Sequence, residues 1–389
     1  MANRMVYLDN SATTRPYDEV TGEVTRIMRE FWGNPSSLHA RGIEAEKILN
    51  QSRDVISASL KAGPVEVIFT SGGTESNNLA LKGAAYANRR KGNHMIGTAT
   101  AHKSVLNTLQ SLEEAGFEVS YLPVDTKGKI DIQQLKETLR GDTILVSIMH
   151  VNNETGVIQP VEQVKEIVRS KASQALLHVD AVQSYDKIPF HPETMGIDLA
   201  TLSAHKIHGP LGIGALYVNK HAMISPVVNG GHQEKGLRGG TENLPGIAGF
   251  GKAVQIGFQN QEENKKTLQH LQTAFRSKLL VHFDNILINT PDHTDAAAPH
   301  ILNVSFCGLR GEVLLRQLES EGIYVSTGSA CTSGNSKPSH VLKAMGLDKK
   351  ALDGAVRFSF SVLNVHDELD YIIDVLKRAE KKQKHLIKS

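Results

Sequence analysis

The sequence predicts an α/β fold with a large, mostly parallel sheet domain and a smaller α/β C-terminal domain. Three observations support this prediction. Between residues 65 and 180, apolar strand-like runs alternate with helical patterns at the spacing typical of parallel sheets. The first of these strands runs into a glycine turn and then a helix. A long helical pattern over 244–280 then leads into a stretch with its own strands and helices.

Composition excludes several classes of protein. A chain of 389 residues is long enough for one large core and a smaller domain. The net charge of +2 does not favour nucleic acid as the main ligand, and we interpret the basic run 377–388 as a solvated helix end. No stretch approaches the roughly 20 apolar residues of a spanning helix, and the N-terminus has no signal-peptide pattern. The two cysteines lie far apart, so we expect no disulfide framework and a cytoplasmic location.

The N-terminal elements come first. A short apolar run at 6–8 is followed by turn and cap formers, and helical periodicity covers 17–32. We predict that the polar loop 33–37 presents Asn34 to a ligand. The alternative is that Asn34 and the proline after it only form a common turn. An amphipathic helix is predicted over 41–60.

The next elements predict an anion site. Strand 65–70 leads into Ser71-Gly72-Gly73-Thr74, and a helix is predicted over 79–91. A glycine turn at a helix N-terminus offers free N–H groups and the positive end of the helix dipole. The motif lacks the lysine of a Walker A loop and does not match GxGxxG, so a single phosphate fits it better than a dinucleotide. The alternative is a well-capped helix that binds nothing.

Alternation continues to Asp180. We predict strands over 94–100, 117–124, 143–150 and 175–180, with helices to 115 and over 131–140 and 161–171. Ligands of parallel α/β sheets bind at the carboxyl ends of the strands. The polar residues at those ends are therefore candidates: Thr74, His102, Asn152, Asn153, Asp180, Gln183, Ser203, His205 and Lys206.

Lys206 stands between two apolar strands predicted over 197–202 and 212–218. A free ammonium group is costly in such a place. The cost disappears if its nitrogen forms a Schiff base with an aldehyde cofactor, so Lys206 is our candidate for a lysine that binds pyridoxal 5'-phosphate (PLP). The alternative is a lysine at a strand end whose amine reaches water.

Three further residues fit the same cofactor. Asp180, at the end of a buried strand, needs a cationic partner, which a protonated pyridine nitrogen supplies. Gln183 can bond the ring oxygen, and His102 can stack on the ring. Considered separately, each of these residues has another interpretation: a helix cap, a surface amide or a core histidine. The pair His205 and His208 lacks a third ligand at suitable spacing, so we predict no intrinsic metal.

The C-terminal part begins with a glycine-rich stretch, 230–241, before the helix 244–280. Cys331 lies among Ser, Thr and Gly, which predicts an exposed, reactive thiol, whereas Cys307 follows an apolar strand and is interpreted as a core residue. Arg357 lies in an apolar strand and needs an anion, either a substrate carboxylate or an internal salt bridge. The remaining elements are strands 286–289, 300–306, 323–326 and 355–361 and helices 310–321, 338–345 and 366–385.

Over essentially its whole length the chain resembles the cysteine desulfurases of the class V aminotransferase family. The motifs that carry the resemblance are YLDNSATT, GNPSS-LHARG, FTSGGTESNN, ATAHKSV, HVNNETG, HVDAVQS, SAHKIHGPLGIGALYV, LRGGTEN and STGSACTSGNSKPSHVL. The long cysteine loop resembles the group I branch. The resemblance implies fold type I of the PLP-dependent transferases. It also implies a large PLP-binding domain over 17–258 and a small domain made of 1–16 and 259–389, with a mobile catalytic-cysteine loop over 326–338.

The resemblance also assigns roles. It implies Lys206, His102 and Cys331 as catalytic residues and Asn34, Asn153 and Arg357 as substrate-binding residues. Thr241 is implied to reach the cofactor phosphate of the other subunit of a homodimer. The cofactor-binding residues are then Gly73, Thr74, His102, Asn153, Asp180, Gln183, Ser203, Ala204, His205, Lys206 and Thr241.

The implied activity removes sulfur from L-cysteine, gives L-alanine and leaves a persulfide on Cys331. A protein acceptor in iron–sulfur cluster assembly or tRNA thiolation would take this sulfur. Cys331 could also serve as a ligand of an iron–sulfur cluster shared with a scaffold protein. We expect no direct nucleic-acid or membrane partner. The alternatives are a selenocysteine lyase or a PLP-dependent aminotransferase, which need no sulfur acceptor at Cys331. A catalytically idle scaffold is disfavoured because Lys206, Asp180 and His102 are all present.

Overall fold

The computed structural model describes residues 5–292, 296–327 and 338–388. Its centre is a seven-stranded sheet in the order β2-β8-β7-β6-β5-β3-β4. β8 runs antiparallel to both of its neighbours, and all other pairs in this sheet are parallel, which confirms the predicted mostly parallel α/β fold. The strands are β2 (Val67–Thr70), β3 (His94–Thr98), β4 (Glu118–Leu122), β5 (Thr143–Met149), β6 (Leu176–Asp180), β7 (Leu199–Ser203) and β8 (Gly214–Val218).

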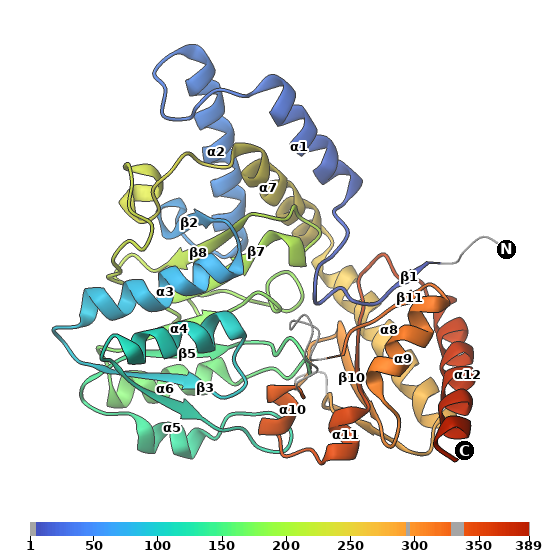
Figure 1. Ribbon diagram of the computed structural model, residues 1–389. Helices are drawn as coiled ribbons and strands as arrows, with labels where there is room; N and C mark the ends of the chain where they lie inside the picture. Colours follow the sequence, from blue (N-terminus) through green and yellow to red (C-terminus); the bar gives the residue numbers. More distant parts are fainter. Residues whose placement is uncertain (1–4, 293–295, 328–337, 389) are drawn as a thin grey trace.

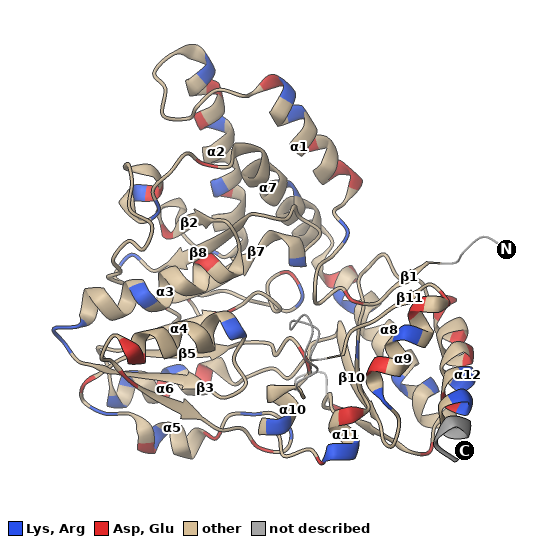
Figure 2. Ribbon diagram, in the orientation of Figure 1, with Lys and Arg blue, Asp and Glu red and all other residues tan. Residues whose placement is uncertain are grey.

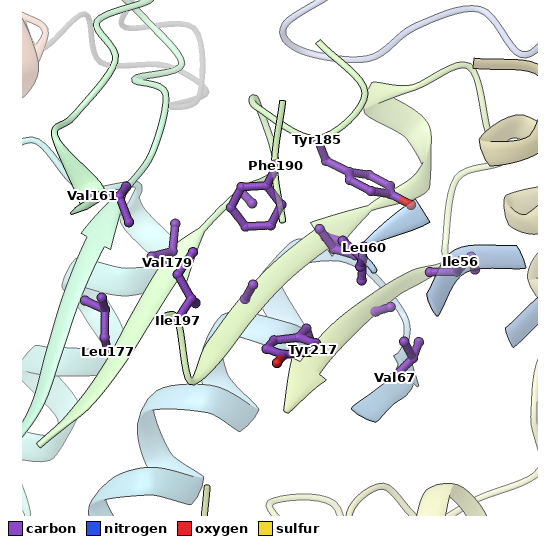
Figure 3. Packing of buried hydrophobic residues seen from close by; sticks show 14 of the residues in the cluster. Ile56, Leu60, Val67, Val161, Leu177, Val179, Tyr185, Phe190, Ile197 and Tyr217 are labelled. Atoms are coloured by element: carbon purple, nitrogen blue, oxygen red, sulfur yellow. The ribbon is translucent and has the colours of Figure 1, made fainter. Parts of the chain in front are cut away.

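Helices cover both faces of this sheet (Figure 1). Alternating side chains of one strand point to opposite faces. Accordingly Val67 and Phe69 belong to one apolar cluster and Ile68 to another. The cluster that contains Ile68 includes residues of α3 (Gly73–Asn88) and α4 (Lys103–Glu114). The cluster that contains Val67 and Phe69 includes residues of five other helices, α1 (Asp18–Glu30), α2 (Ala40–Ser59), α5 (Ile132–Thr138), α6 (Val161–Lys171) and α7 (Leu244–Gln259). Figure 3 shows part of this second cluster.

A second unit lies beside the large sheet and brings the two ends of the chain together (Figure 1). Its apolar cluster joins Val6 and Leu8 to residues between Leu268 and Ala379. We propose that it forms the small domain, with the boundaries predicted above. Its strands are β1 (Val6–Tyr7) with β11 (Ile323–Tyr324), and β9 (Ile286–Ile288), β10 (Ile301–Phe306) and β12 (Ala355–Ser359); its helices are α8 (Gln261–His282), α9 (Gly311–Ser320), α10 (His340–Ala344), α11 (Lys349–Asp353) and α12 (Glu368–Lys388).

The structure differs from the sequence prediction in four places, one of which is α11, because no helix was predicted between 345 and 366. The helix predicted over 244–280 is two helices, because Asn260 leaves helical geometry between α7 and α8 (φ −115°, ψ 14°). α3 begins at Gly73, not at 79, since its first turns contain polar residues that hide the helical pattern. Cys307 is half-buried after β10, so its interpretation as a core residue was wrong.

Charged residues lie mainly on the outer helices, with both signs interspersed, and the strands β5, β7 and β8 carry none (Figure 2). Within the part of the chain that the structure describes, we find no helix with the length and apolarity needed to cross a bilayer.

Candidate active site

A cavity of about 410 Å³ lies at the carboxyl ends of the parallel strands. Met149, Asp180 and Ser203, the last residues of β5, β6 and β7, line it from the large sheet. Ser11 and Arg357 line it from the second unit. It brings together most of the predicted site residues, namely Gly73, Thr74, His102, Asn153, Asp180, Gln183, Ser203, His205, Lys206 and Arg357.

Lys206 ends a 3-10 turn, Ala204–Lys206, that connects β7 to the segment before β8. Its Nζ donates hydrogen bonds of 2.6 Å to the carbonyl oxygens of Ser11 and Ala12. Two main-chain carbonyl oxygens of the segment after β1 therefore hold the amine in the cavity. Ala204 is fully buried behind the turn and does not line the cavity.

Asp180 and Gln183 are both nearly fully buried, and each is held by several hydrogen bonds. The Asp180 carboxylate accepts from the Val182 N–H at Oδ1 (3.1 Å) and from the Asn77 amide at Oδ2 (2.9 Å). The Gln183 amide donates to the Ser11 carbonyl (2.9 Å), and its Oε1 accepts from His300 Nε2 (3.2 Å). Both side chains are therefore oriented by the protein before any ligand binds.

Two of the histidines that line the cavity, His102 and His205, are largely desolvated. His102 caps α4, because its Nδ1 accepts the Ser104 N–H (3.1 Å). Burial lowers the pKa of His102 below its ordinary value. Burial, and then the charge of Lys206, lower the pKa of His205 to about 4. Near neutral pH, His205 is therefore an uncharged ring, with its Nδ1 3.2 Å from Thr13 Oγ1.

The start of α3 has the features of an anion site. Its N-cap Gly72 has φ +147°, and no side chain bonds to the first N–H groups from the cap position. A Cβ on Gly73 would lie 2.9 Å from Val182 Cγ2, so the backbone approaches this wall closely. Ser203 Oγ is buried and has no hydrogen-bond partner among the described residues. A bound phosphate would satisfy these donors, so the residues fit PLP.

Arg357 is buried in β12 and already has two partners. Its guanidinium donates to Asp9 Oδ1 (2.7 Å) and to the Asn153 carbonyl (2.8 Å), while its Nε has no partner among the described residues. The internal salt bridge weighed from the sequence thus exists. A substrate carboxylate would share Arg357 with Asp9.

Several cavity residues were missed by sequence reasoning. Asn77 and Ser104 lie inside helices, where nothing in the pattern marks them. Glu154 follows β5 in the same polar run as Asn153, which was a usable signal. Burial raises the pKa of Glu154, and its carboxyl accepts a hydrogen bond from Ser339 Oγ. Asp9, Ser11, Lys103 and His340 also line the cavity.

Four predicted residues do not line the cavity as described: Ala204, Asn34, Thr241 and Cys331. Asn34 is exposed, and its Oδ1 accepts the Ser36 N–H (2.9 Å), as in a common turn. Thr241 is exposed as well. Cys331 lies outside the described residues. Thr327 on its N-terminal side and His340 on its C-terminal side both line the cavity.

The histidine pair considered as a metal site points to separate partners. His208 stacks on Tyr17 with ring centroids 4.4 Å apart, and its Nδ1 donates to the Arg15 carbonyl (2.7 Å). His205 contacts Thr13 instead. Within the described ranges, no three His, Cys, Asp or Glu side chains are arranged to hold a metal ion.

Comparisons with known proteins agree on one family. The family described as Aminotransferase class-V matches residues 6–372. A "Cysteine desulfurase IscS" of Clostridium botulinum strain Hall is 40% identical over 384 residues, covering 99% of this chain and 96% of that protein. A solved structure titled "NIFS-LIKE PROTEIN" superposes with a TM-score of 0.91 at 41% identity, covering 97% of this chain and 100% of that one. Another, titled "SspA in complex with cysteine", has a TM-score of 0.81 at 34% identity, with coverages of 93% and 100%.

Proposed function

The chain belongs to the class V aminotransferases and, within them, to the cysteine desulfurases, and from that premise we propose which residues carry the removal of sulfur from L-cysteine. The observation that carries the proposal is a single cavity. It combines a lysine, a buried carboxylate, a desolvated histidine and a helix N-terminus with open N–H groups. This is the set of groups that a pyridine ring, an aldehyde and a phosphate require.

We propose that PLP binds here. When bound, PLP supplies the electron sink that makes the substrate α-proton acidic. Gly73, Thr74, Ser203 and His205 would hold its phosphate, and Asp180 and Gln183 its ring nitrogen and ring oxygen. His102 would stack on the ring. Lys206 would hold the aldehyde and then take the α-proton, for which its amine must leave the carbonyls of Ser11 and Ala12.

The substrate proposal rests on Arg357 and Asn153, which meet in the cavity wall. Arg357 would bind the α-carboxylate through its guanidinium. The Cys331 thiolate would attack the substrate sulfur: the carbon–sulfur bond breaks, a sulfur–sulfur bond forms, and a proton completes alanine. This assignment is supported by the cavity positions of Thr327 and His340, which lie on either side of Cys331 in the chain.

We also propose a homodimer. Asn34 and Thr241 are exposed in one chain, which suits residues that complete the site of a second copy. Trp32 and Leu38 beside Asn34 expose 73% and 94% of their surface, more than large apolar side chains normally do in water. The acceptor of the sulfur, in iron–sulfur assembly or tRNA thiolation, and the cytoplasmic location remain predictions.

The test compares alanine formation with sulfur capture in the PLP-loaded enzyme given L-cysteine. We expect the wild type to release alanine and form a persulfide, and Cys331→Ser to lose both while still binding PLP. Cys307→Ser is the matched control, since Cys307 is half-buried outside the cavity, and it should keep both activities. Wild-type alanine formation by Cys331→Ser would instead indicate a lyase.

A further inference from the structure

We propose that Asn77 and Ser104 are positioning residues that hold Asp180 and His102 in the orientation needed at the cofactor ring. This inference rests on the proposed function, because it concerns the two groups assigned there to the ring nitrogen and the ring face. Neither residue was singled out from the sequence. Both line the cavity, and together they connect α3, α4 and the end of β6.

Asn77 is the centre of this arrangement. It is 1% exposed, and its Nδ2 donates to Asp180 Oδ2 (2.9 Å) and to Ser104 Oγ (2.8 Å). An amide nitrogen has two hydrogens, so both are used. The reversed amide would place its oxygen against a carboxylate oxygen, which is repulsive. Asp180 therefore fixes which way Asn77 points, and Asn77 in turn restrains Asp180.

Ser104 connects Asn77 to His102 through hydrogen bonds of its hydroxyl group. Since Ser104 Oγ accepts from Asn77, its own hydrogen is free to donate to His102 Nδ1, 2.8 Å away. The Ser104 main-chain N–H also donates to Nδ1, at 3.1 Å. With two donors directed at it, Nδ1 is an acceptor, so the hydrogen of the neutral ring lies on Nε2. Burial, which lowers the pKa of His102, favours the same neutral ring.

Asp180 is restrained from both sides. Asn77 donates to one of its oxygens and the Val182 N–H to the other. Rotation of the carboxylate would break both hydrogen bonds, and hydrogen bonds to charged groups are among the stronger ones. One rigid chain thus runs from Val182 through Asp180, Asn77 and Ser104 to His102.

The test uses the PLP-loaded, full-length enzyme with histidine nitrogens labelled by 15N. His102→Gln identifies the His102 signals. We expect wild-type signals of a ring protonated at Nε2. Ser104→Ala keeps the main-chain N–H, and so the Nε2 tautomer, but loses the hydroxyl donor, so its Nδ1 signal should shift. Ser104→Thr keeps the hydroxyl and should restore the wild-type pattern. Asn77→Ala should change the visible absorption of the cofactor and lower kcat by about 10- to 100-fold, the effect of one lost hydrogen bond to a charge.

Matched controls lie on the same helices. Asn78 bonds the Thr74 carbonyl within α3, and Ser111 bonds the Thr108 carbonyl within α4. Asn78→Ala and Ser111→Ala should leave both spectra and kcat unchanged. If Asn77→Ala does not fold, the Ser104→Ala and Ser104→Thr pair decides. The inference is overturned if Ser104→Ala keeps the wild-type His102 signals, or if Asn77→Ala lowers thermal stability and leaves the absorption unchanged. A wild type that neither binds PLP nor forms alanine would overturn the proposed function instead.

Discussion

The two walls of the cavity are built differently. On the sheet wall, Lys206 bonds main-chain carbonyls, and Asp180 and His102 are held by neutral donors. Ser203 Oγ there has no partner among the described residues. On the opposite wall, Arg357 and Asp9 already form an ion pair at 2.7 Å. Each wall has a donor without a partner among the described residues, Ser203 Oγ and Arg357 Nε, but a ligand that binds Arg357 must share its charge with Asp9.

This difference separates two kinds of consequence. Changes in the sheet wall should alter cofactor binding and the chemical step. Changes in the opposite wall should alter substrate affinity, because the charge there is balanced internally until a carboxylate arrives. Lys206→Ala and Arg357→Ala test this separation directly, and Glu234→Gln, which lies outside both walls, is the comparison.

Lys206→Ala should abolish turnover. It removes the amine and its hydrogen bonds to the main-chain carbonyls of Ser11 and Ala12, and it leaves the buried apolar clusters on both faces of the sheet unchanged. Folding should therefore persist. The measurement is alanine release, with circular dichroism as the control for folding. If borohydride reduction and peptide mapping place the cofactor on another lysine, the assignment of Lys206 is wrong.

Glu234→Gln should destabilise the fold without acting on either wall. Its carboxylate binds Arg53 through two hydrogen bonds of 2.6 and 2.8 Å and accepts the Phe69 N–H (2.7 Å). Breaking such a buried pair costs about 3–5 kcal/mol, since the remaining charge is left uncompensated. Denaturant unfolding measures this loss. Arg316→Ala, at an exposed ion pair, is the control and should change stability by less than about 1 kcal/mol.

Glu234 does not line the cavity. If Glu234→Gln raised KM by a factor whose free-energy equivalent matched its loss of stability, that result would contradict the separate roles of the two cavity walls.

Arg357→Ala should raise KM for L-cysteine, with a loss of about 2–5 kcal/mol for a buried charge-assisted pair. PLP binding should be retained, since the hydrogen bonds of the Arg357 guanidinium go to Asp9 and the Asn153 carbonyl and not to Lys206 or Asp180. Steady-state kinetics and cofactor absorption give the two readouts, with Arg316→Ala again as the control. An unchanged KM would mean that Arg357 serves the ion pair with Asp9 and not the substrate.

Mild acid should destabilise the protein through His178. This ring is fully buried between Ser147 Oγ (2.8 Å) and Thr201 Oγ1 (3.0 Å), and burial lowers its pKa to about 3. Below the ordinary pKa of about 6.5 the unfolded chain takes up a proton that the folded ring refuses. Stability therefore falls as pH drops from 6.5 towards 3, by about 2 kcal/mol at pH 5 for this group.

Unfolding curves at pH 7 and pH 5 measure this effect. His178→Asn should reduce the loss between the two pH values, while the exposed His221→Asn should leave it unchanged. Equal losses in the wild type and His178→Asn would show that another group dominates.

The sequence predicted the sheet and most of the sheet wall, because strand ends and glycine turns have local signals. Lys206, Asp180 and His102 all follow apolar strands, and parallel strands bring their carboxyl ends to one edge. The Arg357–Asp9 pair joins residues 348 positions apart, and no local pattern specifies such a pairing. Asn77 and Ser104 were missed for a related reason: their partners come from other elements. The break at Asn260 has no proline, and the nearest glycine, Gly257, lies inside the last turn of α7, where it does not interrupt the helical pattern.

The most direct test of the account is mass spectrometry of the PLP-loaded enzyme after incubation with L-cysteine. We predict one added sulfur atom on Cys331, none on Cys307, and none on either cysteine in Lys206→Ala. That result would show that sulfur reaches Cys331 only when Lys206 of the sheet wall is present. Alanine release by the wild type with no sulfur on Cys331, or equal labelling in Lys206→Ala, would contradict it.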